Sequence, residues 1–568
     1  MEKHDYLHNL RHTAAHLTAH AVMELFPGTL LTIGPVTETG FFYDCLPTKN
    51  FKEEDLPLIE ARMHEIAKRG YFITGRQVPK DEARELYAHN KFKRELIDQI
   101  PDETVGIYTQ GEFFDLCRGG HVDEVGAVKY FKLMSISGSY WRADRNGQAL
   151  QRITGVCFAT QKELDAHLKM LEDVQAFDHR RLGKQLDMFS FHDVAPGIPF
   201  FHHKGLLVYN KMIEFLRYLR GNTYQEIKTP LIMHESLWHT SGHYENYREN
   251  MYFTSVEDAT FCVKPMNCPG SILHYDEKPH SYRELPLRLA EFGNVHRFEL
   301  SGALHGLFRV RAFTQDDAHI YCTIDQIEQE ILGLMSLVGK LYGKFGFTEV
   351  KRFLSMRPEK SMGSDEAWEK ATGALKNALD GSGFSYEIDE GGGAFYGPKI
   401  DMKIVDAMGR EWQCGTIQVD FTQPENFKLE YIDSDQSRKR PVMIHVALYG
   451  SIERFFGILL EHTKGVLPFW ITPVQVRVLT ITDAQKEYAQ GVMQELRLAG
   501  IRAEFDESGD QISAKIRRAQ VEKIPWMIVV GQKEVDQQTV TLRHSDGKQE
   551  FGLVLADVVL RAQKEAAY

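Results

Sequence analysis

Two pairs of reactive side chains share one spacing in the N-terminal part of the sequence. His12 and His16 stand four residues apart in RHTAAHLTAH, and Cys117 and His121 repeat that spacing in CRGGH. Residues four apart lie on one face of a helix. Imidazole and thiol groups bind zinc, and they also take part in hydrolysis. The spacing leaves three interpretations open: a metal site, a hydrolytic site that orients water, or structural histidines.

A second group of candidate residues consists of arginines in the middle of the chain. Arg297 and Glu299 are expected two residues apart on one strand face, with Arg309 and Arg311 across the following turn. Arg454 is expected near the start of a helix in GSIERFFGILLEH. Arginines on paired strands and at a helix N-terminus can bind phosphate oxygens bidentately. Each alone would be interpreted as a surface ion pair, but together they predict a phosphate clamp.

The elements that must position these residues begin with an N-terminal segment, 1–160. It combines a helix over about 9–25 with short apolar strands such as Leu31–Val36 and Phe41–Tyr43. A charged stretch from Gln161 to Leu186 has leucines at helical spacing and predicts a helical connector, within a linker over 161–189.

Two further segments follow the linker. Residues 190–467 are rich in glycine, aromatic residues and alternating strands, two of which flank the loop Ser301–Gly306. The pattern changes again near Pro468–Pro473, and 468–568 predicts a small α/β domain. Its helices are expected over 483–499, 511–523 and 554–566.

Length and composition limit the class of protein. A chain of 568 residues is too long for one domain, and 43% apolar with 26% charged residues is typical of globular proteins. No run of about 18 apolar residues occurs, and the N-terminus is too polar for a secretory signal, so we expect no membrane association. Seven scattered cysteines predict a reducing, cytoplasmic location. The net charge of −12 argues against a nucleic-acid partner, although local basic groups such as 438–440 can still face phosphates.

Several stretches resemble the class II aminoacyl-tRNA synthetases. YQEIKTP, FGNVHRFE with FRVRAFTQDDAHIYC, and GSIERFFGILLEH are similar to motifs 1, 2 and 3 of that class. KPMNCPG, FTQDDAHI, AFYGPKID, PVMIHVALYGSIERF and DHRRLGKQLDMF resemble, more narrowly, the bacterial threonyl-tRNA synthetases, over nearly the whole chain. The resemblance implies a multidomain α+β and α/β fold. It assigns an α+β editing domain to 1–160, a helical linker to 161–189, an antiparallel-sheet catalytic domain to 190–467 and an α/β anticodon-binding domain to 468–568.

The resemblance implies that threonine is activated with ATP to threonyl-adenylate and transferred to tRNA-Thr. It also implies Mg²⁺ and one Zn²⁺ per chain, with Cys268, His319 and His445 as protein ligands. Three ligands and one open position are typical of catalytic zinc, whereas the same residues without their flanking motifs would be read as core residues. In the family, threonine fills the open position with its amino and hydroxyl groups, and Asp317 binds the hydroxyl proton.

Further roles follow from the resemblance. Arg297 would hold the α-phosphate of ATP and the substrate carboxylate, Glu299 the adenine end and Phe313 the adenine face. Arg309 and Arg454 would bind the β- and γ-phosphates with Mg²⁺. The amino-acid and adenylate pocket would contain Gln315, Tyr396, Lys399 and Gln418, and His243 would lie near the terminal ribose during transfer.

The need to distinguish threonine from similar amino acids gives the N-terminal histidines and cysteine a role. A zinc that needs a hydroxyl ligand rejects valine, whose isosteric side chain leaves a polar site unpaired. Serine keeps both ligating groups, and its missing methyl supplies only about 1–3 kcal/mol of discrimination. A second, hydrolytic site is therefore required, and His12, His16, Cys117 and His121 are the candidates.

The family context selects among the three interpretations of those residues. A related alanyl-type editing domain is thought to bind zinc through similar residues, whereas the threonyl family is thought to edit seryl-tRNA without metal. The resemblance adds Tyr43, Lys93 and Asp115 to the site. We therefore expect metal-free hydrolysis of mischarged seryl-tRNA-Thr.

The chain also departs from the family pattern. We expect no ubiquitin-like domain ahead of the editing region. Gly120 stands where the editing loop usually has proline, which frees the backbone. Asp506–Gln511 stands where the family usually has a pattern like Asp-x-Arg-Asn-Glu-Lys, and the loss of basic residues there is expected to weaken contact with a polyanion. Glu534 and Arg543 match anticodon-reading positions, so we expect anticodon recognition in an altered form.

Two functions of different classes remain at this stage. The first is a charging enzyme with editing, a homodimer through motif 1. The second is a synthetase-like paralogue that edits in trans or binds RNA as a regulator without charging tRNA. The paralogue would be expected to lose Arg297, Arg454 and the zinc ligands, and all of them are present.

Overall fold

The computed structural model describes residues 3–144 and 146–568. The chain forms two compact units, Met1–Glu172 and Asp173–Tyr568, and helix α5 (Gln161–Ala176) crosses the boundary between them in the sequence. Within the described part of the chain, no helix has the length and apolar character needed to cross a membrane.

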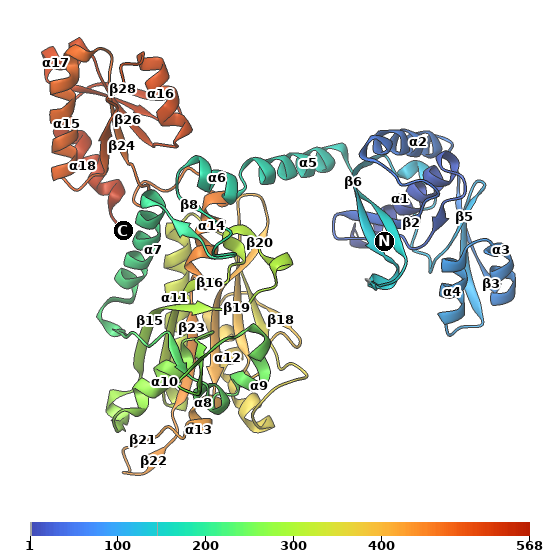
Figure 1. Ribbon diagram of the computed structural model, residues 1–568, viewed down its shortest axis with the longest axis horizontal. Coiled ribbons are helices and arrows are strands. Elements are labelled where there is room, and N and C mark those ends of the chain that lie inside the picture. Colours follow the sequence, from blue (N-terminus) through green and yellow to red (C-terminus); the bar gives the residue numbers. More distant parts are fainter. Residues whose placement is uncertain (1–2, 145) are drawn as a thin grey trace. The chain divides into compact units, whose positions relative to one another are not determined.

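The first unit is built around helix α1 (Lys3–Leu25), which begins six residues before the predicted helix (Figure 1). Its buried residues, including Leu10, Ala14 and Leu17, pack in one core with the sheet β1-β2-β7-β6. The strands are Leu30–Leu31, Gly40–Leu46, Ala149–Phe158 and Tyr130–Tyr140 in that order. The prediction of a regular strand over Leu31–Val36 is wrong, since only Leu31 belongs to β1. Thr32 and Ile33 still hydrogen-bond with Asp44, and Val36 forms an isolated bridge with Phe41, so the segment follows β2 irregularly around Gly34 and Pro35.

A second, smaller sheet of the first unit has the order β3-β4-β5. Its strands are Ile73–Pro79, Thr104–Gln110 and Phe113–Leu116, and the helices of this region are α2 (Leu56–Lys68), α3 (Lys80–Leu86) and α4 (Lys91–Gln99). The side chain of Asn90 caps α4 by accepting hydrogen bonds from the amides of Phe92 and Lys93. The cap places Lys93 at the buried start of the helix.

An eight-stranded sheet organises the second unit, in the order β10-β15-β16-β23-β20-β19-β17-β18. The strands from β15 to β17 in this order pair antiparallel, and β10 and β18 join the edges in parallel. Their bounds are Gln225–Glu226, Leu287–His296, Ala312–Cys322, Val442–Ala447, Glu411–Asp420, Lys399–Val405, Val350–Ser355 and Glu387–Asp389. The predicted antiparallel sheet of residues 190–467 is confirmed.

The central strand β16 has two different faces. Ala318, Ile320 and Cys322 belong to the main hydrophobic core, whereas Asp317 and His319 point to the opposite side because side chains alternate along a strand. The core also contains residues of helices α7 (His203–Arg220), α11 (Ile327–Lys344), α12 (Asp365–Ser382) and α14 (Ile452–His462).

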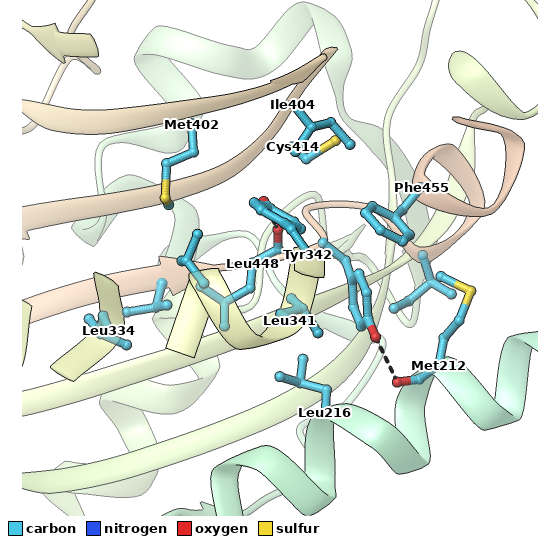
Figure 2. Packing of buried hydrophobic residues seen from close by; sticks show 14 of the residues in the cluster. Met212, Leu216, Leu334, Leu341, Tyr342, Met402, Ile404, Cys414, Leu448 and Phe455 are labelled. Atoms are coloured by element: carbon cyan, nitrogen blue, oxygen red, sulfur yellow. Dashed lines mark hydrogen bonds between the residues drawn. The ribbon is translucent and has the colours of Figure 1, made fainter. Parts of the chain in front are cut away.

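Hydrogen bonds inside this core tie the helices to the segment that precedes α14. Figure 2 shows Tyr342 among Leu341, Met402 and Phe455. The Tyr342 hydroxyl donates to the carbonyl of Leu448 at 2.5 Å. The sheet face that carries the polar residues is therefore backed by a packed apolar layer.

Smaller elements surround the sheet. They are β8 (Phe189–Ser190), β9 (Phe200–Phe201), β11 (Ile232–His234), β12 (Tyr252–Val256), β13 (Ala259–Val263), β14 (His280–Ser281), β21 (Tyr431–Ile432), β22 (Arg438–Lys439), α8 (Ser236–Thr240), α9 (His243–Tyr247), α10 (Cys268–Asp276) and α13 (Thr422–Asn426).

The connector is two helices rather than the one predicted. Helix α5 ends at Ala176, and α6 (His179–Gln185) starts behind Asp178, whose carboxylate accepts a hydrogen bond from the Arg180 amide at 2.8 Å. An N-cap aspartate inside the charged stretch starts a new helix, which helical periodicity alone did not indicate.

The C-terminal part is the predicted α/β domain. Its sheet has the order β25-β24-β26-β27-β28, with strands Ala503–Phe505, Val476–Thr480, Trp526–Val530, Val540–His544 and Gln549–Leu553. The helices are α15 (Lys486–Leu498), α16 (Ile512–Val521), α17 (Gln532–Gln537) and α18 (Leu555–Ala566). The three predicted helices are confirmed to within three residues at each end, and α17 was missed because it is short.

A buried ion pair anchors strand β15. Lys264 Nζ lies 2.8 Å from Glu291 Oε1 and 2.8 Å from Thr229 Oγ1, and both charged side chains are buried. Lys264→Met is expected to lower the free energy of unfolding by about 3–5 kcal/mol, because it leaves the Glu291 carboxylate buried without its cation. Urea unfolding followed by tryptophan fluorescence measures the change. The double variant Lys264→Met/Glu291→Leu should be more stable than the single variant, and the reverse order would contradict the assignment.

Candidate active sites

A cavity in the second unit collects the predicted phosphate-binding arginines. Its wall contains Arg297, Glu299, Arg309, Phe313 and Arg454. Arg454 lies in the first turn of α14, whose N-cap Ser451 accepts a hydrogen bond from the Arg454 amide at 3.1 Å. A helix N-terminus and three guanidinium groups can bind phosphates, and an aromatic ring can stack on a base, so this cavity fits a nucleoside triphosphate.

The strand prediction for this region is wrong in one respect. Strand β15 ends at His296, so Arg297 and Glu299 lie beyond it instead of sharing a strand face. Glu299 Oε2 accepts a hydrogen bond from Arg309 Nε at 3.0 Å, which brings the two sides of the turn together. Arg311 is buried and donates to the Glu299 carbonyl, so it supports the turn and does not line the cavity.

A second cavity adjoins the first. Its wall contains Cys268, Gln315, Asp317, His319, Tyr396, Gln418 and His445. Arg297, Gln315, Cys414 and Gly450 line both cavities. The Arg297 guanidinium also lies over the Phe313 ring, 5.1 Å from its centre. The Arg297 guanidinium can therefore contact a ligand in either cavity at the place where the two cavities join.

The three predicted zinc ligands converge. The ligand atoms of Cys268, His319 and His445 all lie within 4.8 Å of one another. His319 and His445 face each other across β16 and β23, and Cys268 opens α10. His445 Nε2 also lies 2.9 Å from Asp420 Oδ2, a carboxylate contact that orients metal-binding histidines. This donor set and its convergence fit Zn²⁺.

Asp317 has a partner that the sequence reasoning missed. The Asn267 amide donates to Asp317 Oδ2 at 2.7 Å, and both side chains are buried in the wall of the second cavity. Burial raises the pKa of Asp317 to about 7, while the Asn267 hydrogen bond opposes that shift. Asn267 precedes Cys268 in KPMNCPG, and that adjacency is the only signal in the sequence for its place in the site.

Two predicted residues lie outside both cavity walls. His243 is fully buried, with Nδ1 2.8 Å from Ser241 Oγ and Nε2 2.9 Å from Met266 Sδ. Lys399 Nζ pairs with Asp401 Oδ2 at 2.5 Å. Asp401 accepts hydrogen bonds from Gln413 and Thr416, which do line the cavities. Lys399 is therefore connected to the cavity walls only through Asp401.

Two buried acids that the sequence analysis did not single out shape the segment before α14. Asp316 accepts hydrogen bonds from the amides of Leu448, Tyr449 and Gly450 at 2.9–3.1 Å. Glu453 accepts from the Thr314 amide through both oxygens, at 3.1 and 3.0 Å. These contacts bind β16 to the start of α14, which positions Arg454.

In the first unit, all seven predicted editing residues come together. The ligand atoms of His12, His16, Cys117 and His121 lie within 4.8 Å of one another, and the His12 and His121 rings stack with centroids 4.1 Å apart. Behind them, Tyr43 donates to Asp115 Oδ2 at 2.5 Å, and Lys93 forms an ion pair with Asp115. His16 Nε2 lies 3.9 Å from the same carboxylate, which joins the two groups.

Burial sets the protonation of this cluster. It lowers the pKa of His12, lowers that of His16 well below its ordinary value, and lowers that of His121 to about 2. The imidazoles are therefore neutral near pH 7, and each keeps a ring nitrogen that can accept a hydrogen bond from water. Burial also raises the pKa of Cys117 to about 12, so in the metal-free site its sulfur is a thiol and a poor nucleophile. The convergent geometry fits a metal ion as well as a bound water.

Gly120 changes the path of the editing loop. Its φ is +85°, which the proline ring cannot adopt. His12 Nδ1 lies 3.2 Å from the Gly120 carbonyl. If Nδ1 donates to that carbonyl, Nε2 is the nitrogen that remains as an acceptor. The glycine therefore orients His12 as well as freeing the backbone.

The candidate anticodon residues occupy the C-terminal sheet and the helix beside it. Glu534 accepts hydrogen bonds from the Gly531 amide and the Thr541 hydroxyl, at 2.9 and 2.8 Å. Thr541 and Arg543 are two apart on β27 and share a face. Asp510, in the segment that departs from the family pattern, pairs with Arg518 at 2.9 Å, so its charge is balanced within the domain.

Comparison with known proteins gives three matching families. The model of the tRNA synthetase class II core domain (G, H, P, S and T) matches residues 252–463. An anticodon binding domain matches residues 475–565, and the threonyl and alanyl tRNA synthetase second additional domain matches residues 105–154.

Individual relatives match over most of the chain. The chain is 51% identical over 538 residues to the threonine–tRNA ligase of Clostridium tetani, covering 94% of this chain and 84% of that protein. It is 51% identical over 537 residues to the threonine–tRNA ligase of Acetivibrio thermocellus, with the same coverages of 94% and 84%. Among solved structures, it is similar to the RNA binding domain of threonyl-tRNA synthetase from Cryptosporidium parvum, with TM-score 0.66, 44% identity, and 68% of this chain and 98% of that chain covered.

The buried acid Glu453 predicts a pH dependence of stability. Burial raises its pKa from 4.5 to about 7. The folded chain therefore keeps a proton that the unfolded chain releases near pH 4.5. The contribution of Glu453 is fully present below that pH and falls as pH rises toward 7, by about 3 kcal/mol at about 1.4 kcal/mol per pKa unit.

Replacing the acid should remove that part of the pH dependence. We expect the free energy of unfolding of Glu453→Gln, measured by urea unfolding between about pH 4.5 and 7.5, to fall less steeply than that of the wild type. Glu565→Gln, at an exposed glutamate of α18, serves as the control and should keep the wild-type slope. Equal slopes for Glu453→Gln and the wild type would refute the assignment.

Proposed function

The chain belongs to the threonyl-tRNA synthetase family. We propose that the site in its second unit charges tRNA and that the site in its first unit hydrolyses mischarged tRNA. The chain is a class II threonine–tRNA ligase, which uses ATP and Mg²⁺ to join threonine to tRNA-Thr. The alternative, a paralogue without charging activity, is not favoured because the class II core, its cavity arginines and its convergent Cys-His-His set are all present.

We propose that the two adjoining cavities hold ATP and threonine. Arg297 lines both, and this observation carries the assignment. It can neutralise the α-phosphate and the threonine carboxylate while a carboxylate oxygen attacks the α-phosphorus and pyrophosphate leaves. Phe313 and Glu299 would bind adenine, and Arg309 and Arg454 the β- and γ-phosphates with Mg²⁺.

The second cavity selects the amino acid. Cys268, His319 and His445 would hold Zn²⁺, which supplies a Lewis acid for the amino and hydroxyl groups of threonine and excludes valine. Asp317, oriented by Asn267, would accept the hydrogen bond of the hydroxyl. Gln315, Tyr396 and Gln418 complete the wall, and Lys399 lies behind it. His243 would lie near the terminal ribose during transfer only after leaving its buried position outside both walls.

Seryl-tRNA-Thr would be hydrolysed in the first unit. The histidines and Cys117 would position the ester and a water, whose oxygen attacks the ester carbonyl carbon as the water releases a proton, and the bond to the ribose oxygen breaks. That oxygen regains a proton, which releases serine and the tRNA. Lys93 and Tyr43, held by Asp115, lie behind the histidines and would orient the ester. We propose that this hydrolysis needs no metal.

Other features complete the proposal. The domains would be editing 1–160, linker 161–189, catalytic 190–467 and anticodon-binding 468–568, with Glu534 and Arg543 reading the anticodon. The enzyme would act as a homodimer through the motif 1 region around Pro230. All seven cysteines are free thiols, which supports a reducing cytoplasm.

Charging assays on the editing variants test the division of labour. His12→Ala or His16→Ala should leave charging of tRNA-Thr with threonine intact while seryl-tRNA-Thr accumulates, because only the hydrolytic site is altered. Wild type should accumulate no seryl-tRNA-Thr, and neither the wild type nor the variants should charge valine. Loss of threonine charging in these variants, with no seryl product, would contradict the proposal.

Metal content tests the two candidate clusters separately. Wild type and His16→Ala should each contain one zinc per chain by mass spectrometry of the purified protein, whereas Cys268→Ala or His319→Ala should contain none and lose threonine activation. A second zinc that disappears in His16→Ala would place a metal in the editing site. It would overturn the metal-free mechanism and leave the catalytic assignment standing.

A further inference from the structure

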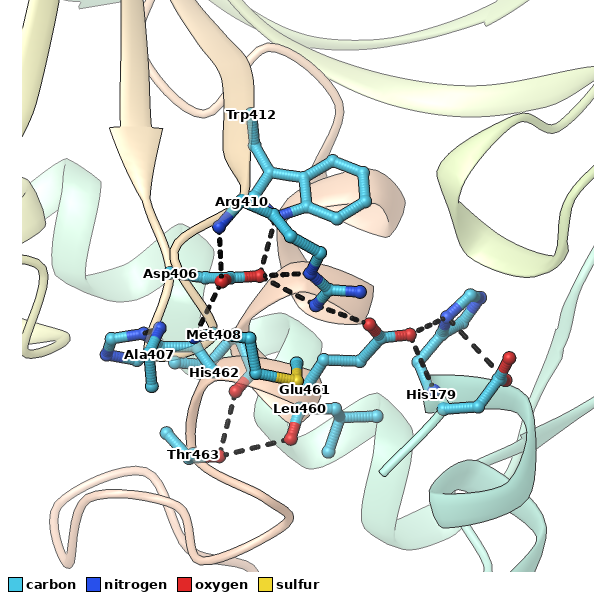
Figure 3. A network of polar contacts seen from close by, with 12 residues as sticks. His179, Asp406, Ala407, Met408, Arg410, Trp412, Leu460, Glu461, His462 and Thr463 are labelled. Carbon is cyan, nitrogen blue, oxygen red and sulfur yellow. Dashed lines mark hydrogen bonds and ion pairs between the residues drawn. The ribbon is translucent and has the colours of Figure 1, made fainter. Parts of the chain in front are cut away.

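A buried polar network lies behind the nucleotide cavity and takes no part in the mechanism above (Figure 3). His179 opens α6, Glu461 lies in the last turn of α14, and Asp406 and Arg410 flank the turn between β19 and β20. His179 and Glu461 are almost completely buried, with side-chain exposures of 0% and 2%. Burying such polar groups costs free energy unless each has a partner, so the contacts of each group indicate what holds it in place.

The contacts of His179 define its hydrogen-bonding state. Its Nδ1 lies 2.6 Å from Glu461 Oε1, and its backbone amide donates to the same oxygen at 2.8 Å. Its Nε2 accepts a hydrogen bond from the Leu307 amide at 3.0 Å. Because an amide N–H can only donate, Nε2 is the bare nitrogen and Nδ1 carries the hydrogen. The imidazole therefore donates at one end and accepts at the other.

Arg410 closes the other side of the network. It forms ion pairs with Glu461 Oε2 at 2.7 Å and with Asp406 Oδ2 at 2.6 Å. Asp178, His179 and Glu461 converge closely enough to hold an ion. The guanidinium already supplies a cation beside Glu461, and the Leu307 amide occupies His179 Nε2, so the charge of Glu461 is balanced without a metal.

The turn that His179 contacts forms part of the nucleotide cavity. This turn, η8 (Gly306–Phe308), packs tightly on the imidazole, since a Cβ atom at Gly306 would lie 2.2 Å from Nε2 and the Phe308 ring centroid lies 4.0 Å from the imidazole centroid. Leu307, Phe308 and Arg309 line the cavity. The position of Arg309 therefore depends on a turn whose amide is held from behind.

We propose that His179 is a positioning residue for ATP: it fixes the Leu307 amide so that the turn presents Arg309 to the nucleotide, and it ties the linker to the nucleotide cavity. The inference rests on the proposed assignment of ATP to this cavity. A buried amide that loses its acceptor is unfavourable, so without His179 the turn shifts to find another partner. Because the turn would contact ATP equally in the ground and transition states, its loss raises KM for ATP more than it lowers kcat.

Two substitutions separate the two ends of the imidazole. In His179→Asn, the amide nitrogen replaces Nδ1 and keeps the Glu461 contact, but no atom reaches Leu307. In His179→Gln, the longer side chain places its carbonyl oxygen near the position of Nε2 and keeps the Leu307 contact. ATP–pyrophosphate exchange at saturating threonine should show KM for ATP about tenfold higher for His179→Asn, the effect of one lost hydrogen bond, and near wild type for His179→Gln.

Controls distinguish this role from general destabilisation and from failure of the ATP assignment. Leu182→Ala removes a buried side chain of the same helix α6, and it should lower the melting temperature without changing KM for ATP. Arg309→Ala should raise KM for ATP; if it does not, the assignment of ATP to this cavity fails. If Arg309→Ala raises KM while His179→Asn and His179→Gln both behave as wild type, or if His179→Gln alone raises KM, the role of His179 is overturned.

Discussion

The alternation of side chains along β16 is the constraint on which the catalytic unit depends. Its even-numbered residues from Ala318 to Cys322 pack into the apolar core, which forces Gln315, Asp317 and His319 onto the other face. Antiparallel pairing with β23 then sets His319 opposite His445. A slip of one residue in this register would exchange the two faces, so the hydrophobic core that stabilises the sheet also holds in place the cavity proposed for the amino acid.

Buried polar groups hold the segments of the cavity walls that lie outside the regular strands. The segment between β23 and α14 pairs with β16 only through an isolated bridge between Ser451 and Gln315, and Asp316 holds it through three backbone amides. Glu453 joins α14 to β16, and His179 joins the linker to the turn that presents Arg309. Each of these groups is buried and hydrogen-bonded, so moving any of them would leave donors or acceptors unpaired. The cavity walls are therefore held by directional contacts from behind as well as by apolar packing.

The separation into two units matches a physical limit on recognition. One site can reject valine by requiring a hydroxyl, but the methyl that distinguishes threonine from serine contributes too little binding energy for accurate selection. Hydrolysis in a separate unit gives the chain a second selection step. The chemistry of the two clusters differs accordingly: one is a Cys-His-His set beside carboxylates and an arginine, and the other is a stack of neutral histidines backed by a lysine, a tyrosine and an aspartate.

The sequence by itself determined the family and the class of fold, and it predicted candidate residues that the structure brings together in two clusters. Motifs such as FTQDDAHI keep several functional residues on one strand, where spacing reports which side chains share a face. The sequence pattern did not indicate breaks in elements: only Leu31 of the strand predicted at 31–36 lies in a regular strand, and the connector divides at Asp178. The roles of Asn267, Glu453 and His179 were decided only by the tertiary structure, since their partners lie 50, 139 and 282 residues away in the chain. Local sequence pattern reports periodicity and capping, whereas a buried hydrogen bond between distant segments exists only once the chain has folded.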